Sequence, residues 1–447
     1  MKNPLRLGAL LLGLFGSIAA QGAAVQPPEG FTALFNGTDT KGWRGGSTFD
    51  HRALLEMPEE ERTAKIEKWT SDMLAHWSIA DGELVNDGKG AYATTEKDFG
   101  DFELLLEYKT VPKADSGVYL RGVPQVQIWD PTEPDEKGLG RALGSGGLWN
   151  NSPGAPGKDP LVKADKPFGE WNQLRVVMVG ARVSIWLNGM MTVDHAQLEN
   201  YYDRVSKDPE IKANPRPIPR YGPIQLQTHG AEIRWRNIFL REIASEEANR
   251  ILSAHGEGSD WKKLFNGENL DGWQGPVDEY EVVDGAIKCK PKKGGTLHTV
   301  ESFANFKVRA EINLPPGGNN GFAIRYPGTG NTAYVGMCEL QVLDDSAEKY
   351  AKLDKRQYHG SAYGMAAAHR GYQRPVGDWN FEEVTVDGSR IKVELNGFII
   401  LNTDLSTVSE FMANSPHPGK DSTSGYFGFA GHGDAVSFRA VRAQHLP

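Results

Sequence analysis

Short segments in which apolar and polar residues alternate make up most of the chain, and Gly, Asn and Asp-Gly turns separate them. In "FEEVTVDGSRIKVELNG" (381–397), two such segments flank an Asp-Gly turn. Alternation with a period of two places the apolar residues on one face of a β-strand, and an Asp-Gly turn between two strands indicates a hairpin. The pattern predicts an all-β protein built as antiparallel β-sandwiches of the jelly-roll type.

The segments occur twice in the same order. "ALFNGTDTKGW" (33–43) returns as "KLFNGENLDGW" (263–273), and "SGVYLRG" (116–122) returns as "NGFAIRY" (320–326). Collinear matches of this kind indicate a duplicated unit, and 447 residues suffice for two sandwiches. We expect three parts after the N-terminal region: a first sandwich, a linker and a second, more divergent sandwich, at 25–245, 246–260 and 261–447.

One helix is expected in the first copy. Equivalent positions lie 230 residues apart at the Leu-Phe-Asn-Gly motif and 203 apart at the next Asp-Gly turn, so the first copy has 27 extra residues between them. In this insertion Pro58 precedes acidic residues, and Ile66, Trp69, Met73 and Trp77 follow at helical spacing. The insertion is therefore predicted to form an amphipathic helix against the sandwich.

The N-terminal residues resemble an export signal. Lys2 and Arg6 precede an apolar run over 7–18, and small residues follow. This is the pattern of a secretory signal peptide, which we place at 1–24, and the run is too short to span a bilayer. We expect a periplasmic or secreted protein without membrane insertion.

Charge and cysteine content narrow the classes of partner. The formal net charge is −9 with scattered basic residues, which argues against nucleic acid and anionic membranes and favours an uncharged or weakly charged small molecule. Cys289 and Cys338 could form a disulfide or remain two separate buried thiols. Two cysteines alone do not make a metal site.

Polar residues recur on one face of a predicted strand in each copy. In "CELQVLDD" (338–345), Glu339 and Gln341 share a face and Asp344 follows the strand, and in "PQVQIWD" (124–130) the face holds two glutamines and a tryptophan before an aspartate. Paired carboxylates can perform acid and base chemistry on a sugar, although such a face can also be merely solvated. The residues of the first copy are Gln125, Gln127, Trp129 and Asp130.

An arginine and a histidine also recur. Arg121 and Arg325 occupy the same repeat position in apolar strands, where an arginine needs a ligand or a structural partner such as Glu107 or Glu311. His229 and His432 each precede a glycine before the last strand of their copy, and each could transfer protons or be a turn residue bonded to backbone.

Aromatic residues could supply sugar stacking. Long Gly-rich loops follow the polar strands and are suited to form the rim of a binding groove. With Asp115 at the start of its strand, the candidate substrate contacts outside the polar strands are Asp115, Trp149, Asn150 and Tyr363.

Together these motifs resemble the 3-keto-disaccharide hydrolase domain. The residues that carry the resemblance are "LFNGxxxxGW", "DSGVYLRG", "QVQIWD", "GEWN", "WLNG" and "LQTHG", and the match extends once over each half of the mature chain. The resemblance implies concanavalin-like jelly rolls similar to the laminarinase-type glucanases. In those enzymes a strand motif of carboxylates is catalytic, and here Glu339, Gln341 and Asp344 fall at its positions, with an amide in the middle. The first copy lacks the first carboxylate, so its strand cannot support a two-carboxylate retaining mechanism.

The resemblance also implies cleavage of 3-keto-glycosides by elimination and hydration. That chemistry requires a base, an acid and a group that stabilises an enolate. Arg121 or Arg325 could stabilise the enolate and His229 or His432 could move protons. The base or cation ligand would come from Asp115, Asp130, Glu339 or Asp344, and a divalent cation such as calcium could polarise the ketone, although no spacing identifies a metal site. The first copy, with its more complete motifs, is the expected active one. A non-catalytic glycan-binding protein and a laminarinase-like enzyme, in which Glu339 and Asp344 converge, remain the alternatives.

Overall fold

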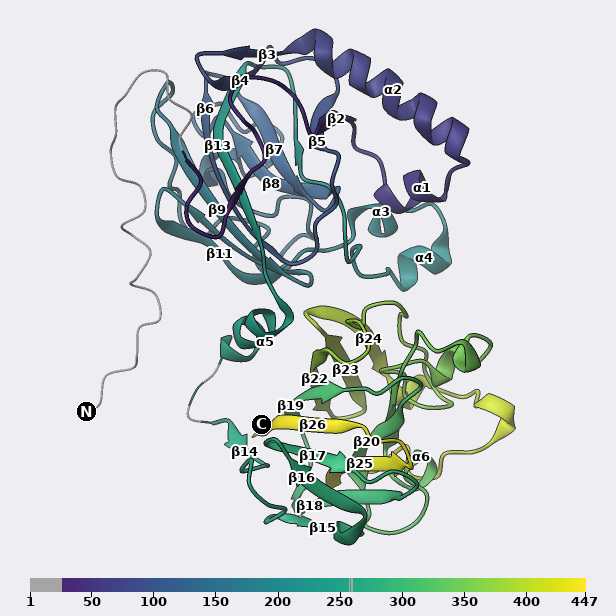
Figure 1. Cartoon of the computed structure of the whole chain (residues 1–447). Helices are drawn as coiled ribbons and strands as arrows, with labels where there is room; N and C mark the ends of the chain where they lie inside the picture. Colours follow the sequence, from purple (N-terminus) through teal and green to yellow (C-terminus); the bar gives the residue numbers. More distant parts are fainter. Residues whose placement is uncertain (1–25, 257, 259) are drawn as a thin grey trace, which may run out of the picture. The chain divides into compact units, whose positions relative to one another are not determined.

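The computed structural model describes residues 26–256, 258 and 260–447 (Figure 1). The predicted signal peptide at 1–24 lies outside this part of the chain. The chain divides into two compact units between Ile243 and Ala244. Each unit has one large and one five-stranded antiparallel sheet.

In the first unit the large sheet has the strand order β11-β10-β9-β6-β13-β4-β3, and β1 pairs with β13. Its strands are β1 (Thr32–Ala33), β3 (Trp77–Ala80), β4 (Glu83–Asn86), β6 (Phe102–Thr110), β9 (Asn172–Val179), β10 (Arg182–Leu187), β11 (Met190–Gln197) and β13 (Ile233–Glu242). The smaller sheet has the order β2-β5-β12-β7-β8. Its strands are β2 (Trp43–Gly46), β5 (Tyr92–Thr95), β7 (Asp115–Leu120), β8 (Val123–Trp129) and β12 (Gln225–Leu226).

The second unit repeats this order. Its large sheet runs β16-β17-β26-β19-β22-β23-β24 with β14 beside β26, and its smaller sheet runs β15-β18-β25-β20-β21. The strands of the large sheet are β14 (Lys262–Lys263), β16 (Tyr280–Val283), β17 (Ala286–Cys289), β19 (Phe306–Asn313), β22 (Trp379–Asp387), β23 (Arg390–Leu395), β24 (Phe398–Asp404) and β26 (Ser437–His445). Those of the smaller sheet are β15 (Trp273–Gln274), β18 (Gly294–Phe303), β20 (Asn319–Tyr326), β21 (Cys338–Leu343) and β25 (Gly425–His432).

The predicted fold class is confirmed: two β-sandwich jelly rolls follow each other in the chain. The hairpin expected over 381–397 is β22 and β23, joined at the Asp387 and Arg390 pair. The core lies between the two sheets of each unit. In the second unit, for example, Phe429 of the small sheet stacks on Phe438 of the large one, with ring centroids 3.9 Å apart.

The predicted helical insertion of the first copy is confirmed as two helices. α1 (His51–Glu56) begins after Asp50, whose side chain accepts a hydrogen bond from Arg52 N, and α2 (Glu59–His76) begins with three glutamates that suit the positive end of the helix dipole. Thr70 Oγ1 of α2 accepts a hydrogen bond from Gly45 N of β2 at 3.0 Å. A Cβ at Gly45 would lie 2.0 Å from the Trp69 backbone, so a glycine is needed for the helix to cover this edge strand.

The segment at 246–260, predicted as a short helix and a Gly-rich linker, begins with a helix that belongs to the second unit. α5 (Ser245–Ala254) packs on the large sheet, where Asn249 Nδ2 donates to Trp379 O at 3.2 Å and Glu246 pairs with Arg439 at 2.8 Å. Burial of Ala248, Asn249 and Leu252 fixes the helix to this sandwich. The other helices are the short α3 (Tyr201–Arg204), α4 (Pro209–Ala213) and α6 (Thr332–Val335) and the 3₁₀ turns η1 (Arg141–Leu143), η2 (Val277–Glu279), η3 (Glu348–Tyr350), η4 (Lys355–Gln357), η5 (Leu405–Thr407) and η6 (Met412–Asn414).

Cys289 and Cys338 are both buried and unpaired, so the reading as two separate thiols holds. Within the described residues, none of the helices combines the length and the apolar character needed to cross a bilayer.

Candidate functional site

A polar face of the small sheet carries the candidate residues of the first copy. On β8, Val126 and Ile128 point into the core, so Gln125, Gln127 and Trp129 point to the other face. Gln127 pairs with Gly117 across β7, and Trp129 pairs with Asp115. The register therefore brings the polar residues of both strands to one place, as the alternating pattern predicted.

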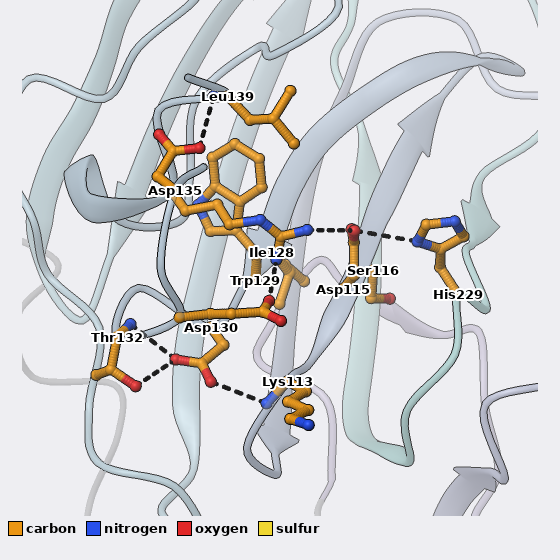
Figure 2. A network of polar contacts seen from close by, with 12 residues as sticks. Lys113, Asp115, Ser116, Ile128, Trp129, Asp130, Thr132, Asp135, Leu139 and His229 are labelled. Carbon is orange, nitrogen blue, oxygen red and sulfur yellow. Dashed lines mark hydrogen bonds and ion pairs between the residues drawn. The ribbon is translucent and has the colours of Figure 1, made fainter. Parts of the chain in front are cut away.

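These side chains form a hydrogen-bonded chain that ends at a carboxylate. Gln125 Nε2 donates to Gln127 Oε1, and Gln127 Nε2 donates to Asp115 Oδ1 at 3.0 Å. His229 Nδ1 lies 3.1 Å from Asp115 Oδ2, and Figure 2 shows its ring directed at that carboxylate. Arg141 Nη2 lies 3.4 Å from the same oxygen. Asp115 thus receives an amide, an imidazole and a guanidinium, and it links the histidine to the glutamines.

Aromatic residues lie beside this cluster. The rings of Trp129 and Trp149 meet edge to face at 6.1 Å, and the Arg141 guanidinium lies 5.5 Å from the Trp129 ring centroid. The Trp129 Nε1 donates to Gly144 O, which fixes the ring. The side-chain Oδ1 of Asn150 is buried and has no hydrogen-bond partner among the described residues. The Gly-rich loop after β8 therefore places Trp149 beside Trp129 of the sheet.

The second copy has the same register with different residues. Gln341 pairs with Gly321, and Leu343 pairs with Asn319, so Asn319 corresponds to Asp115 and Glu339 corresponds to Gln125. Gln341 Nε2 donates to Asn319 Oδ1 at 2.7 Å. The central glutamine therefore makes the same contact in both copies.

The carboxylate and the amide have exchanged positions between the copies. The first copy has Asp115 and Gln125 around its central glutamine, and the second has Asn319 and Glu339. His432 Nε2 lies 3.2 Å from Glu339 Oε1, so the histidine of each copy contacts whichever side chain is the acid. Each face holds one carboxylate with one histidine.

The surroundings of His432 favour its charged form. The hydrogen bond to Glu339 raises the pKa of His432, and burial of part of the ring opposes this shift without reversing it. The neighbouring rim residue Tyr363 donates its backbone N–H to Glu339 O at 2.9 Å, and burial raises the pKa of its phenol. The second face thus favours an imidazolium beside a buried carboxylate.

Asp130 and Asp344 close turns. Asp130 accepts hydrogen bonds from Lys113 N at 2.8 Å, from Thr132 N at 2.7 Å and from Thr132 Oγ1 at 2.6 Å (Figure 2). Asp344 accepts from Gly317 N at 2.7 Å and Ser346 N at 2.9 Å. Burial tends to raise the pKa of both carboxyls, but these hydrogen bonds outweigh it and lower them. These hydrogen bonds occupy the carboxylate oxygens of Asp130 and Asp344. Both aspartates therefore hold their turns, and the histidines contact Asp115 and Glu339 instead.

Arg121 and Arg325 also take no part in the contacts between the carboxylates and the histidines. Arg121 is fully buried, and its guanidinium donates to Gly100 O at 2.8 Å, to Pro219 O at 3.3 Å and to Asp101 Oδ1 at 2.9 Å. Glu107, considered as a structural partner of Arg121, pairs with Arg236 instead.

Arg325 repeats this role in the second copy. It donates to the carbonyl oxygens of Ala304, Gly388 and Ser422 at 2.8 to 2.9 Å, while Glu311 pairs with Arg439. The recurrence of the two arginines has a structural cause: each ties backbone carbonyls of neighbouring loops together.

Two residues of the site were not anticipated. Arg141 lies in the Gly-rich loop, and only its place in an otherwise uncharged "GLGRALGSGG" stretch could have indicated it. Asn319 could have been found by aligning the copies at Asp115. Among residues 26–256, 258 and 260–447, no group of three or more His, Cys, Asp or Glu side chains is arranged to hold a metal ion.

Comparison with known proteins identifies the family. The model of the 3-keto-alpha-glucoside-1,2-lyase-like domain matches twice, over residues 30–241 and 260–444. The chain belongs to the 3-keto-alpha-glucoside-1,2-lyase-like family. The two matches coincide with the two sandwiches, so each unit is one copy of this family domain.

Two relatives and one more distant solved structure illustrate the similarity of this chain to known proteins. A 3-keto-disaccharide hydrolase of Bacteroides thetaiotaomicron is 27% identical over 224 residues, which cover 41% of this chain and 77% of that protein. A crystal structure from Parabacteroides distasonis, of a protein provisionally named a glycosyl hydrolase, is 25% identical with a TM-score of 0.38, covering 42% of this chain and 99% of that one. The carbohydrate-binding module CBM66 of Bacillus subtilis is 13% identical with a TM-score of 0.24, covering 41% and 95%.

Proposed function

We propose that this protein cleaves the glycosidic bond of 3-keto-glycosides by elimination followed by hydration. The observation that carries the proposal is the contact of one carboxylate with one histidine on the polar face of each family domain, at 3.1 Å for Asp115 and His229 and 3.2 Å for Glu339 and His432. Membership of a family whose description includes a 1,2-lyase supports it at the level of reaction class.

A base and an acid supply the proton transfers of this reaction. The C3 ketone acidifies the C2 hydrogen, so a carboxylate can remove that proton and form an enolate. The enolate then forms a C1–C2 double bond and expels the C1 oxygen, which takes a proton from the imidazolium. Water adds its oxygen to C1 and a proton returns to C2, so the net reaction is hydrolysis. One carboxylate and one histidine can hold these roles on either face.

Stabilisation of the enolate needs a cation or a hydrogen-bond donor. Arg141 is the guanidinium nearest to the carboxylate in the first copy, while Arg121 and Arg325 are held by carbonyl groups. In the second copy the amide of Gln341 is on β21, the same strand as Glu339. A divalent cation such as calcium remains an expectation, and because the described residues do not gather a ligand set for one, no step is assigned to it.

The first copy also supports a second candidate, a glycan-binding role. Trp149 is only partly buried and can stack on a sugar ring, next to the buried and hydrogen-bonded side chains of Gln125, Gln127 and Trp129. Residues 1–24 further lead us to propose export to the periplasm or beyond. Mass spectrometry of the mature N-terminus would test the export, because an unprocessed Met1 would contradict it.

Incubation with 3-keto-glycosides in D₂O tests the reaction. Elimination and hydration place one deuterium at C2 of the released 3-keto-sugar, whereas direct displacement at C1 places none. Proton NMR of the product distinguishes these outcomes, and parallel reactions with calcium and with a chelator test the cation. A D115N/E339Q double variant is the control for contaminating activity. Intact 3-keto-glycosides under all conditions would contradict the proposal.

A further inference from the structure

The two copies do not present their carboxylates in the same way. Asp115 accepts three contacts: Gln127 at 3.0 Å on one oxygen, and His229 at 3.1 Å and Arg141 at 3.4 Å on the other. Arg141 is further anchored by Glu133 at 2.7 Å. A guanidinium does not exchange its proton in the working pH range. These three contacts occupy most of the roughly four lone-pair positions of the Asp115 carboxylate, so Asp115 has less room than a carboxylate with one partner to take a proton from carbon.

Glu339 is held more loosely. Among the described residues its carboxylate has one polar side-chain contact, the 3.2 Å approach of His432 to Oε1. The adjacent amide of Gln341 is turned to Asn319 instead. The Glu339 side chain is only 3% exposed, so a carboxylate here has little water around it. A desolvated carboxylate with one partner is suited to act as a base.

The aromatic residues beside the polar face also differ between the two copies. The first copy has Trp129 opposite Asp115, whereas the second copy has Leu343 opposite Asn319. Trp129 is in edge contact with Trp149 and lies under Arg141. Trp129 is buried, but Trp149 beside it is only partly buried, and a partly exposed tryptophan next to a firmly held acid is a feature of a sugar-binding site. The first copy therefore combines the features for holding a sugar, and the second those for proton transfer.

We infer that the two family domains divide the work. The Glu339 and His432 pair of the second copy performs the proton transfers, and the Asp115, His229 and Arg141 cluster of the first copy binds a sugar without converting it. This division rests on the proposed function and reverses the expectation that the copy with the more complete motifs is the active one. Its ligands are a 3-keto-glycoside at the second face and an unoxidised glycan or the same glycoside at the first.

Matched variants of the full chain test the division. E339Q is expected to lower kcat by about 100-fold or more, the contribution typical of a positioned base. D115N is expected to weaken glycan binding in calorimetric titration, while kcat on the 3-keto-glycoside falls by less than about threefold. E348Q, in the exposed turn η3, is the control for a carboxylate-to-amide change in the second copy. Circular dichroism and unfolding midpoints establish that each variant folds.

The outcomes separate the division from the reaction itself. Loss of kcat in D115N with turnover retained in E339Q would overturn the division while leaving the proposed reaction standing. Equal loss in both variants would also overturn it. If the parent protein converts no 3-keto-glycoside, the proposed reaction fails, and calorimetric titration with trehalose and its 3-keto form then decides the binding half. Binding that D115N weakens and E339Q leaves intact supports the role of the first copy, and the reverse pattern overturns it.

Discussion

Glu339 and His432 lie 3.2 Å apart at the end of a five-stranded sheet, although 93 residues separate them in the chain. In the first copy the equivalent histidine, His229, contacts Asp115. Asp115 lies on β7, whereas Glu339 lies on β21, the counterpart of β8. The histidine is thus the constant member of the pair, and the acid can come from either of two positions around the central glutamine. This relationship makes the histidines the best probes of the site.

Removal of the Glu339 charge should lower the pKa of His432. The hydrogen bond to Glu339 is the largest cause of its raised pKa, so E339Q leaves burial, which lowers it. NMR titration of the His432 ring measures the shift, with E348Q as the control. A His432 pKa above the ordinary value gives the pair a stabilising effect that is present below about pH 6.5 and is lost as the pH rises through the folded pKa. An unchanged His432 titration in E339Q would contradict the contact.

Turnover should depend on protonated His432. If its imidazolium protonates the leaving oxygen, kcat falls as the pH rises through the raised pKa of His432. In H432N this alkaline fall should disappear together with most of the activity, by about 100-fold or more. The kcat profile of the parent from pH 5 to 9 is the measurement. A kcat that stays constant across the NMR-determined pKa of His432 would rule out this role.

Much of this architecture could be predicted because it follows from local patterns. Alternation on β8 and β21 identified the face of Gln127 and Gln341, since the side-chain period of a strand fixes it. Contacts between distant strands could not be predicted from one sequence. The repeat showed that Arg121 recurs, but only the fold reveals the carbonyl groups of Gly100 and Pro219 around it. A buried arginine that binds backbone carbonyl groups and an arginine that binds a ligand have the same sequence pattern.

Replacement of Arg121 should therefore affect stability more than chemistry. R121K cannot reproduce the three directed contacts to Gly100, Pro219 and Asp101, so it should lower the free energy of unfolding by about 3 to 5 kcal/mol, as for a broken buried pair. Denaturant unfolding measures this loss. R390K, at an exposed pair 3.9 Å long, is the control and should change stability by less than about 1 kcal/mol. A folded R121K with normal stability and no turnover would show that Arg121 serves the reaction directly.

Asp130 should contribute stability that depends on acid pH. Burial raises the pKa of its carboxyl, but hydrogen bonds from Thr132 and Lys113 outweigh this and lower it. Such a group stabilises the fold above about pH 4, its unfolded value, and this contribution is lost as the pH falls through the folded pKa. D130N should lower the free energy of unfolding by about 1 to 3 kcal/mol at pH 7 and flatten the acid limb. Unfolding curves between pH 3 and 7 test this, and a D130N variant with parent-like curves would contradict the turn role.

Gly321 should be required for the position of Glu339. Gly321 faces Gln341 on the neighbouring strand, and a Cβ there would lie 2.3 Å from Glu339 Oε1. G321A must therefore push the carboxylate away from His432. We expect a fall in kcat of about tenfold or more, the scale of a misplaced catalytic group, together with a lowered His432 pKa. G258A, where a Cβ meets nothing within 4 Å, is the control. Parent-like kcat and His432 titration in a folded G321A would mean that Glu339 does not depend on this space, and the assignment of Glu339 as the positioned base would have to be abandoned.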